Sequence, residues 1–161
     1  MEISNCVNKN VAIEKINAVQ PKLNAVVTMV DEADNTKEGK LSGVPVALKD
    51  NISTCGIRTT ASSRILDNYV PVYDATIVKK LREAGADFVC KASMDELGMG
   101  GTNKNAYTGA VHNPYDLDRI PGGKLSALSR KYFIPMITKP SSFLQGFLDR
   151  KSTRLNSSHR T

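Results

Sequence analysis

Tryptophan is absent from the 161-residue chain, and aromatic residues make up only 6% of it. No stretch approaches the roughly 18 consecutive apolar residues of a membrane-spanning helix, so the sequence predicts no contact with a membrane. The first segment, MEISNCVNKN, has neither a basic start nor an apolar stretch, which argues against a secretory signal peptide. We therefore expect a cytosolic, globular protein.

Cysteine and histidine are too few and too scattered for the common metal sites. Cys6, Cys55 and Cys90 form no C-x-x-C pair, and His112 and His159 are the only histidines. This pattern predicts reduced thiols and no metal site. A nucleophilic pair of Cys55 or Cys90 with a histidine is an alternative on residue types alone, but buried structural thiols are the favoured interpretation.

Basic residues exceed acidic ones by six, but the excess is confined to the last part of the chain. Residues 124–161 contain 8 of the 22 Lys and Arg and 1 of the 16 Asp and Glu, which leaves residues 1–123 with 14 basic and 15 acidic residues. Aromatic residues in this tail are sparse and unpatterned, unlike those of RNA-binding segments. The asymmetry favours a solvated, disordered tail, with a nucleic-acid-binding tail as the alternative.

The first half of the chain predicts a helix followed by a short apolar segment. Residues 11–23, VAIEKINAVQPKL, place apolar residues at helical spacing, and Pro21 is expected to end the helix. These apolar positions are Ala12, Ile16, Val19 and Leu23. Residues 23–30 fit either a strand or the start of a helix, and the charged residues 31–42 fit a solvated turn or a short helix.

A strand, a helix and a second strand are then predicted in series. VPVAL (44–48) and ADFVC (86–90) have the length and composition of buried strands. Between them, ATIVKKLREA (75–84) predicts a helix with Asp74 as N-cap and Gly85 as the stop. Its expected buried face consists of Ile77, Leu81 and Ala84. This order is typical of a parallel α/β unit.

Lysines stand at the carboxyl ends of both predicted strands, where open α/β sheets place their ligands. Two interpretations of Lys49 are open. It is either a structural side chain that snorkels or pairs with a carboxylate, or a desolvated base, which would need a hydroxyl partner. Lys91 is interpreted only as a structural strand-end lysine. The loops GMGGTN (98–103) and NPYDLDRIPGG (113–123) suit close backbone approach to a ligand, although the GGK at 122–124 is not a P-loop.

An ordered series of segments resembles one enzyme family. The segments are LNAVVT, LSGVPVALKDNI, TTASS, YDATIVKKLREAGADFVCKASMDELGMG and NPYDLDRIPGG. From about residue 12 to Gly123 they resemble the amidase signature family, and within it the A subunits of glutamyl-tRNA(Gln)/aspartyl-tRNA(Asn) amidotransferases. The resemblance implies an α/β fold with a mixed β-sheet sandwiched by helices, here incomplete, with residues 1–123 as the N-terminal fragment of an amidase domain.

The resemblance also implies a chemistry. The family uses a Ser–cis-Ser–Lys triad, and Lys49 in ALKDN matches its lysine, while Met99 and Gly100 match a segment beside the substrate. It implies glutamine as the ammonia donor, B and C subunits as partners, Glu-tRNA(Gln) as the acceptor in the complex, and ATP and Mg²⁺ used by the partner subunit, with no cofactor in this chain.

The chain departs from the family after Gly123. The family continues into a serine-glycine run and a second Gly-rich serine loop, whereas this chain reads KLSALSR, and Ser126 does not stand at the family's serine position. We expect residues 124–148 to be a shifted reading frame and residues 149–159 to be a translated sequencing adapter. A chain without the serines is expected to be inactive. The alternatives are a fragment of another small-amide hydrolase and a non-catalytic binding fragment.

Overall fold

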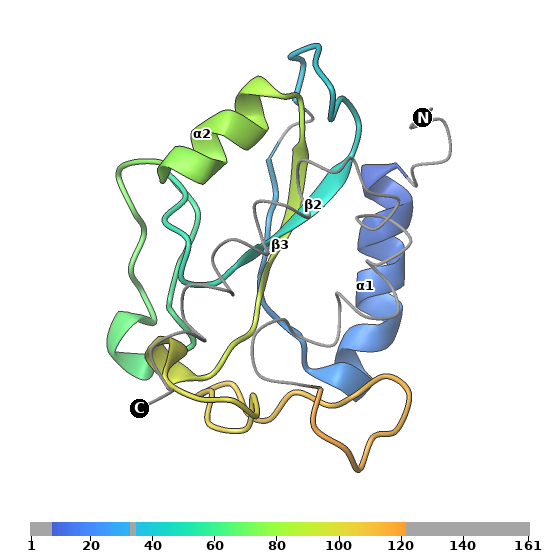
Figure 1. Ribbon diagram of the computed structural model, residues 1–161, viewed down its shortest axis with the longest axis vertical. Helices are drawn as coiled ribbons and strands as arrows, with labels where there is room; N and C mark the ends of the chain where they lie inside the picture. The colour runs from blue at the N-terminus through green and yellow to red at the C-terminus, as the bar shows by residue number, and fades with distance from the viewer. Residues whose placement is uncertain (1–7, 33–34, 122–161) are drawn as a thin grey trace, which may run out of the picture.

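The computed structural model describes residues 8–32 and 35–121. Helices and strands occur in the order α1 (Lys9–Leu23), β1 (Val26–Met29), β2 (Pro45–Lys49), η1 (Arg64–Leu66), α2 (Thr76–Glu83), β3 (Asp87–Ala92) and η2 (Glu96–Gly98). Figure 1 shows the strands crossing the middle of the molecule between α1 and α2. The loops that follow β2 and β3 gather with η1 and η2 at one end.

The sheet in the described residues has three strands in the order β1-β3-β2. β2 and β3 run parallel, as the strand-helix-strand series predicts, and β1 is antiparallel to β3. The sheet is therefore mixed. The segment at residues 23–30, which fitted either a strand or the start of a helix, contains β1. Its backbone groups pair with the backbone groups along the free edge of β3.

Helix α1 includes the residue that was expected to end it. Asn8 caps the helix by accepting a hydrogen bond from the backbone N–H of Val11 at 3.0 Å. Pro21 lies inside the last turn, and the helix ends at Leu23, followed by Asn24 in the left-handed conformation. The helix therefore ends two residues later than expected. Pro21 lacks its own N–H donor, but the turn after it still closes through the hydrogen bond from the Asn24 N–H to the Gln20 carbonyl at 2.9 Å.

Helix α2 is one residue shorter at each end than its predicted range. Ala75, not Asp74, is its N-cap, and no side chain caps the helix. The carboxylate of Asp74 instead accepts from the backbone N–H of Cys55 at 2.7 Å and pairs with Arg82. The N-cap prediction was therefore wrong, because two tertiary partners compete for the same carboxylate. Gly85, with φ of 87°, follows the helix as predicted.

The core is divided between the two faces of the sheet. On one face α1 packs through Ala12 and Ile16 against residues that include Val26 and Val89. On the other face α2 packs through Val78 and Leu81 against a cluster that includes Phe88. Of the predicted buried face of α2, Leu81 is buried and Ile77 and Ala84 are half-buried. A mixed sheet covered by a helix on each face confirms the predicted fold class.

Candidate functional site

The candidate site lies at the carboxyl edge of β2 and β3. Lys49, the last residue of β2, is paired with Ala92, the last residue of β3. The chain leaves the sheet after both residues, into a loop over residues 50–63 and another over residues 93–103. This is the edge at which parallel strands of open sheets place their ligands.

The two predicted lysines lie on opposite faces of the sheet. Ala47 and Ala92 pack against the α1 core, and Lys49 follows Ala47 by two residues and is paired with Ala92. Leu48 belongs to the α2 core, and it is paired with Lys91. Because side chains alternate along a strand, Lys49 lies on the α1 face and Lys91 on the α2 face. The side chain of Lys49 is half-buried.

Asp50 is a completely buried carboxylate beside Lys49. It accepts hydrogen bonds from the backbone N–H of Thr60 at 3.2 Å, from the hydroxyl of Thr60, and from the backbone N–H of Ser62 at 2.9 Å. Its own backbone N–H donates to the carbonyl of Ala92 at 3.0 Å. Asp50 therefore connects the end of β2 to the end of β3 and to the far limb of its own loop.

The loop TTASS contains backbone strain that these contacts stabilise. Ala61 and Ser62 are consecutive left-handed residues with φ of 50° and 51°, which costs each non-glycine residue about 1–3 kcal/mol. The Ser62 hydroxyl accepts from the backbone N–H of Met94 at 3.1 Å, and the Ala61 carbonyl accepts from Leu97 at 2.9 Å. Such strain persists only where many contacts fix it, and it is concentrated at functional sites.

Lys91 is the residue whose environment the sequence did not reveal. Its side chain is completely buried, one residue before the end of β3. The Nζ atom donates to the carbonyl of Ile52 and to the hydroxyl oxygen of Thr54 at 3.0 Å. Burial lowers the pKa of Lys91 to about 8, although attraction to Asp50 and Asp74 opposes that shift. A lysine inside an otherwise apolar strand was the only available signal.

The glycine loop lies next to the chain that follows Lys49. A Cβ added to Gly98 would stand 3.9 Å from the Asn51 side-chain amide. Met99 is 73% exposed, and a Cβ on Gly100 would lie 2.4 Å from Cγ of Asp95. The backbone at Gly100 therefore approaches a buried carboxylate closely. The assignment of Met99 and Gly100 to the substrate pocket stays a prediction.

Two buried polar atoms follow β3 at the same edge. The Ser93 hydroxyl and Oδ1 of Asp95 have no hydrogen-bond partner among the described residues. Both side chains are at least 98% buried, and Oδ2 of Asp95 accepts from the backbone N–H of Thr102 at 3.1 Å. The edge that contains Lys49 therefore also contains unused hydrogen-bonding groups.

The other nucleophile and metal candidates receive little support. Cys90 is buried as expected, and burial raises the pKa of its thiol to about 12, which disfavours the thiolate. Cys55 is exposed, so its predicted burial was wrong. His112 contacts the carbonyl of Leu117 at 3.1 Å. Within residues 8–32 and 35–121, no group of three or more His, Cys, Asp or Glu side chains could hold a metal ion.

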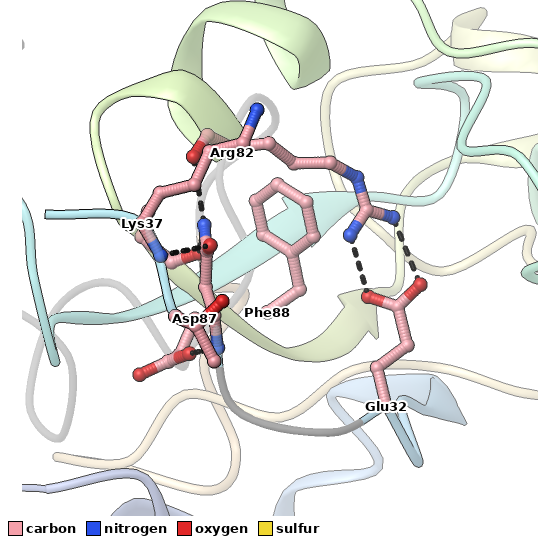
Figure 2. Close-up of a pocket in the computed structure, with 8 residues that line it drawn as sticks. Glu32, Lys37, Arg82, Asp87 and Phe88 are labelled. Atoms are coloured by element: carbon pink, nitrogen blue, oxygen red, sulfur yellow. Dashed lines mark hydrogen bonds and ion pairs between the residues drawn. The ribbon is translucent and has the colours of Figure 1, made fainter.

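A polar pocket of about 230 Å³ lies at the opposite end of β3. Figure 2 shows the Arg82 guanidinium turned toward Glu32, with the ring of Phe88 beside it. The ion pair is bidentate at 2.8 and 3.0 Å, and Cζ of Arg82 lies 4.9 Å from the ring centroid of Phe88. Asp87, the first residue of β3, accepts from the backbone N–H of Asn35 at 2.6 Å. These contacts hold the segment before β2 against the end of α2 and the start of β3.

Several predictions lie outside the described residues. These are the serine position at Ser126, the proposed change of reading frame over residues 124–148, and the solvated tail through residue 161. No helix in the described part of the chain is long and apolar enough to cross a membrane.

Comparison with known proteins identifies relatives of this fold. The amidase family profile matches residues 10–124. The chain is 47% identical over 116 residues to the A subunit of glutamyl-tRNA(Gln) amidotransferase from Lactobacillus acidophilus, with 69% of this chain and 24% of the relative covered. A protein of the same name from Halothermothrix orenii is 50% identical over 115 residues, covering 68% and 24%. The chain spans about a quarter of the length of these relatives.

Solved structures agree with this relationship. The crystal structure of the A subunit of glutamyl-tRNA(Gln) amidotransferase from Thermotoga maritima matches with a TM-score of 0.69 and 44% identity, over 74% of this chain and 26% of that one. The structure of 6-aminohexanoate cyclic dimer hydrolase matches with a TM-score of 0.70 and 28% identity, over 78% and 27%. The chain therefore belongs to the amidase signature family.

Proposed function

We propose that this chain carries the lysine base of a serine-dependent amidase that releases ammonia from glutamine. The observation that carries the proposal is the position of Lys49, half-buried at the carboxyl end of β2, opposite Ala92 and between two hydrogen-bonded loops. The match to relatives named as A subunits of glutamyl-tRNA(Gln) amidotransferase supports glutamine as the substrate.

In the proposed reaction, neutral Lys49 accepts a proton from the nucleophilic serine through a bridging serine. The nucleophile attacks the side-chain amide carbon of glutamine, and backbone N–H groups of a Gly-rich loop stabilise the oxyanion. Lys49 then returns the proton, through the bridging serine, to the leaving nitrogen. Cleavage of the C–N bond releases ammonia and leaves an acyl-enzyme, which water hydrolyses. We place Met99 and Gly100 beside the glutamine.

Both serines belong to the family sequence that follows Gly123, where this chain reads KLSALSR. We therefore propose that the 161-residue chain alone does not hydrolyse glutamine. The complete enzyme is proposed to work in a cytoplasmic complex with B and C subunits, and its ammonia passes to a partner subunit. That subunit uses ATP and Mg²⁺ to activate and amidate Glu-tRNA(Gln), so no step in this chain uses them.

A long sequencing read of the source gene across codon 123 tests whether this chain derives from such a complete enzyme. We expect a serine-glycine run followed by a second Gly-rich serine loop. A gene that continues as KLSALSR would instead contradict the proposed parent enzyme and leave Lys49 without its serines.

The extended protein then tests the base. The family continuation is joined after Gly123, and ammonia release from glutamine is measured for the extended chain, for Lys49→Met and for the exposed control Lys80→Met. Loss of a general base predicts a decrease of about 10²–10⁴-fold in kcat for Lys49→Met and no change for the control. Equal activity of both variants would contradict the role of Lys49.

A second candidate is hydrolysis of another amide, which the 0.70 TM-score to 6-aminohexanoate cyclic dimer hydrolase favours. The same extended chain, assayed against glutamine, a linear amide and a cyclic amide, separates the two candidates by kcat/KM. Preference for a non-glutamine amide would replace the first proposal while keeping Lys49 as the base.

A third candidate, a non-catalytic chain that binds tRNA, is favoured only by the charge of residues 124–161. Retention of tRNA that falls with salt and disappears on deletion of this tail would support it. Retention unchanged by the deletion would contradict it.

A further inference from the structure

The loop that leaves the sheet at Lys49 is held by two buried charged side chains of opposite sign. Asp50 contacts the far limb of the loop, and Lys91 contacts its near limb. Both side chains have an exposed fraction of 0%. Burying a charge is costly unless hydrogen bonds compensate it, so two such residues beside one strand end require an explanation.

Asp50 is matched to donors alone. Its carboxylate receives two backbone N–H groups, from Thr60 and Ser62, and the hydroxyl of Thr60. These contacts hold the consecutive left-handed residues Ala61 and Ser62 in place. A carboxylate offers only acceptors, whereas an asparagine amide would turn N–H groups toward these donors.

Lys91 is matched to acceptors alone. Its Nζ atom reaches from β3 to the Ile52 carbonyl and the Thr54 hydroxyl, both in the turn just after Lys49. That turn is closed by a hydrogen bond from the Ile52 N–H to the Lys49 carbonyl at 2.9 Å. Lys91 therefore fixes the turn from the face of the sheet opposite the Lys49 side chain.

Neither side chain is oriented to react with a substrate. Lys91 lies on the α2 face with no exposed surface, and Asp50 is enclosed by its own loop. Their side-chain contacts all lie in the loop that begins after Lys49, with backbone groups of Ile52, Thr60 and Ser62 and with the hydroxyls of Thr54 and Thr60. The contacts of Ser62 with Met94 and of Ala61 with Leu97 extend this constraint to the loop after β3.

We propose that Asp50 and Lys91 are positioning residues that fix the backbone after Lys49 from two sides, and so hold the Lys49 amine in one arrangement at the edge of the sheet. This role rests on the proposed function of Lys49 as the base. It adds two residues that act through the loop and do not contact the reacting atoms.

Competitive acetylation of the 161-residue chain tests the proposal without requiring amidase activity. A trace of acetic anhydride is added at a series of pH values, and the acetylation of individual lysines is quantified by peptide mass spectrometry. Lys79, exposed on α2, is the internal reference for each sample. Lys9, which is 8% exposed at the start of α1, reports opening at a place distant from the loop.

The variants are Lys91→Met, Asp50→Asn and the exposed control Lys80→Met. Releasing one charge-assisted contact is expected to raise the acetylation rate of Lys49 relative to Lys79 by about tenfold in either positioning variant. Lys9 should keep its rate, because the opening is local. Lys80→Met should leave both rates unchanged.

An unchanged Lys49 rate in folded Lys91→Met and Asp50→Asn overturns the proposal. Equal increases at Lys49 and Lys9 also overturn it, because they would show a general contribution to stability. If Lys91→Met does not fold, Thr54→Val removes one acceptor of Nζ while keeping the lysine. It should raise the Lys49 rate by a smaller factor, and no change would overturn the proposal. The proposed function is tested separately, by the ammonia assay of Lys49→Met, so the two proposals can fail independently.

Discussion

The ammonium group of Lys91 lies 3.0 Å from the hydroxyl oxygen of Thr54, and both side chains are completely buried. The contact joins the end of β3 to the loop that follows β2, beneath the edge where Lys49 ends its strand. A buried cation with oxygen partners at this place has measurable consequences for stability and for the order of the loop.

The first prediction concerns the pH dependence of stability. Burial lowers the pKa of Lys91 to about 8, below the 10.5 of a free lysine. Between these values the unfolded chain binds more protons than the folded one, so the free energy of unfolding should rise as pH increases from 8 to 10.5, by up to about 3 kcal/mol. Urea unfolding at closely spaced pH values measures this increase.

Lys91→Met should remove that increase, and the exposed control Lys80→Met should retain it. The contributions of all other titrating groups cancel when the variants are compared with the parent chain. The same pH slope in Lys91→Met and the parent would show that Lys91 titrates alike in the folded and unfolded states.

The second prediction concerns the glycine loop. Alanine at Gly100 would place its Cβ 2.4 Å from Cγ of buried Asp95, so we expect Gly100→Ala to lower the free energy of unfolding by about 1–3 kcal/mol. Gly101 is the matched control, since no heavy atom lies within 4 Å of an added Cβ there. Thermal unfolding of both variants measures the difference, and equal midpoints would contradict the close approach at Gly100.

The third prediction concerns the ion pair between Arg82 and Glu32. Both side chains are about 30% exposed, and hydrogen bonding to Glu32 raises the pKa of Arg82. A double-mutant cycle with Arg82→Met and Glu32→Gln should give a coupling energy of about 0.5–1 kcal/mol that falls in high salt.

The pair between Arg119 and Asp116 serves as the control for that cycle. Its side chains are 78% and 44% exposed, so its coupling energy should be close to zero. Equal coupling energies in the two cycles would mean that burial and bidentate geometry add nothing to the Arg82 pair.

The fourth prediction concerns the residue that follows α1. Asn24 has φ of 49°, and its side-chain amide donates to the carbonyls of Thr108 at 2.9 Å and Ala110 at 3.2 Å. Asn24→Gly loses the hydrogen bonds and makes the unfolded chain more flexible, whereas Asn24→Ala loses the hydrogen bonds and adds left-handed strain. We expect the alanine variant to be about 1–2 kcal/mol less stable than the glycine variant. Equal urea midpoints for the two variants would contradict the strain at this position.

The elements that depend on local pattern were predictable. The apolar runs VPVAL and ADFVC became β2 and β3, and the periodic segment between them became α2 with Gly85 at its end. The position of Lys49 at the end of a strand followed from the same pattern, because a change from apolar to polar residues marks the end of a buried strand. Its role as a base remains a prediction that the extended chain must test.

The N-cap error at Asp74 and the environment that was missed at Lys91 have one physical cause, which is hydrogen bonding to residues distant in sequence. Asp74 has the chemistry of an N-cap, but Cys55 and Arg82 occupy its carboxylate. Lys91 resembled an ordinary strand-end lysine, but Ile52 and Thr54 supply the oxygen atoms that allow its burial.

The sequence by itself determined the positions of α1, α2, β2 and β3, because side-chain periodicity and turn residues act over short distances along the chain. Only the tertiary structure decided that β1 adds antiparallel to β3, and that Lys49 and Lys91 lie on opposite faces of the sheet. It also decided that Asp50 holds the loop at Thr60 and Ser62. These relationships depend on strand register and on hydrogen bonds between residues far apart in sequence, which local patterns do not specify.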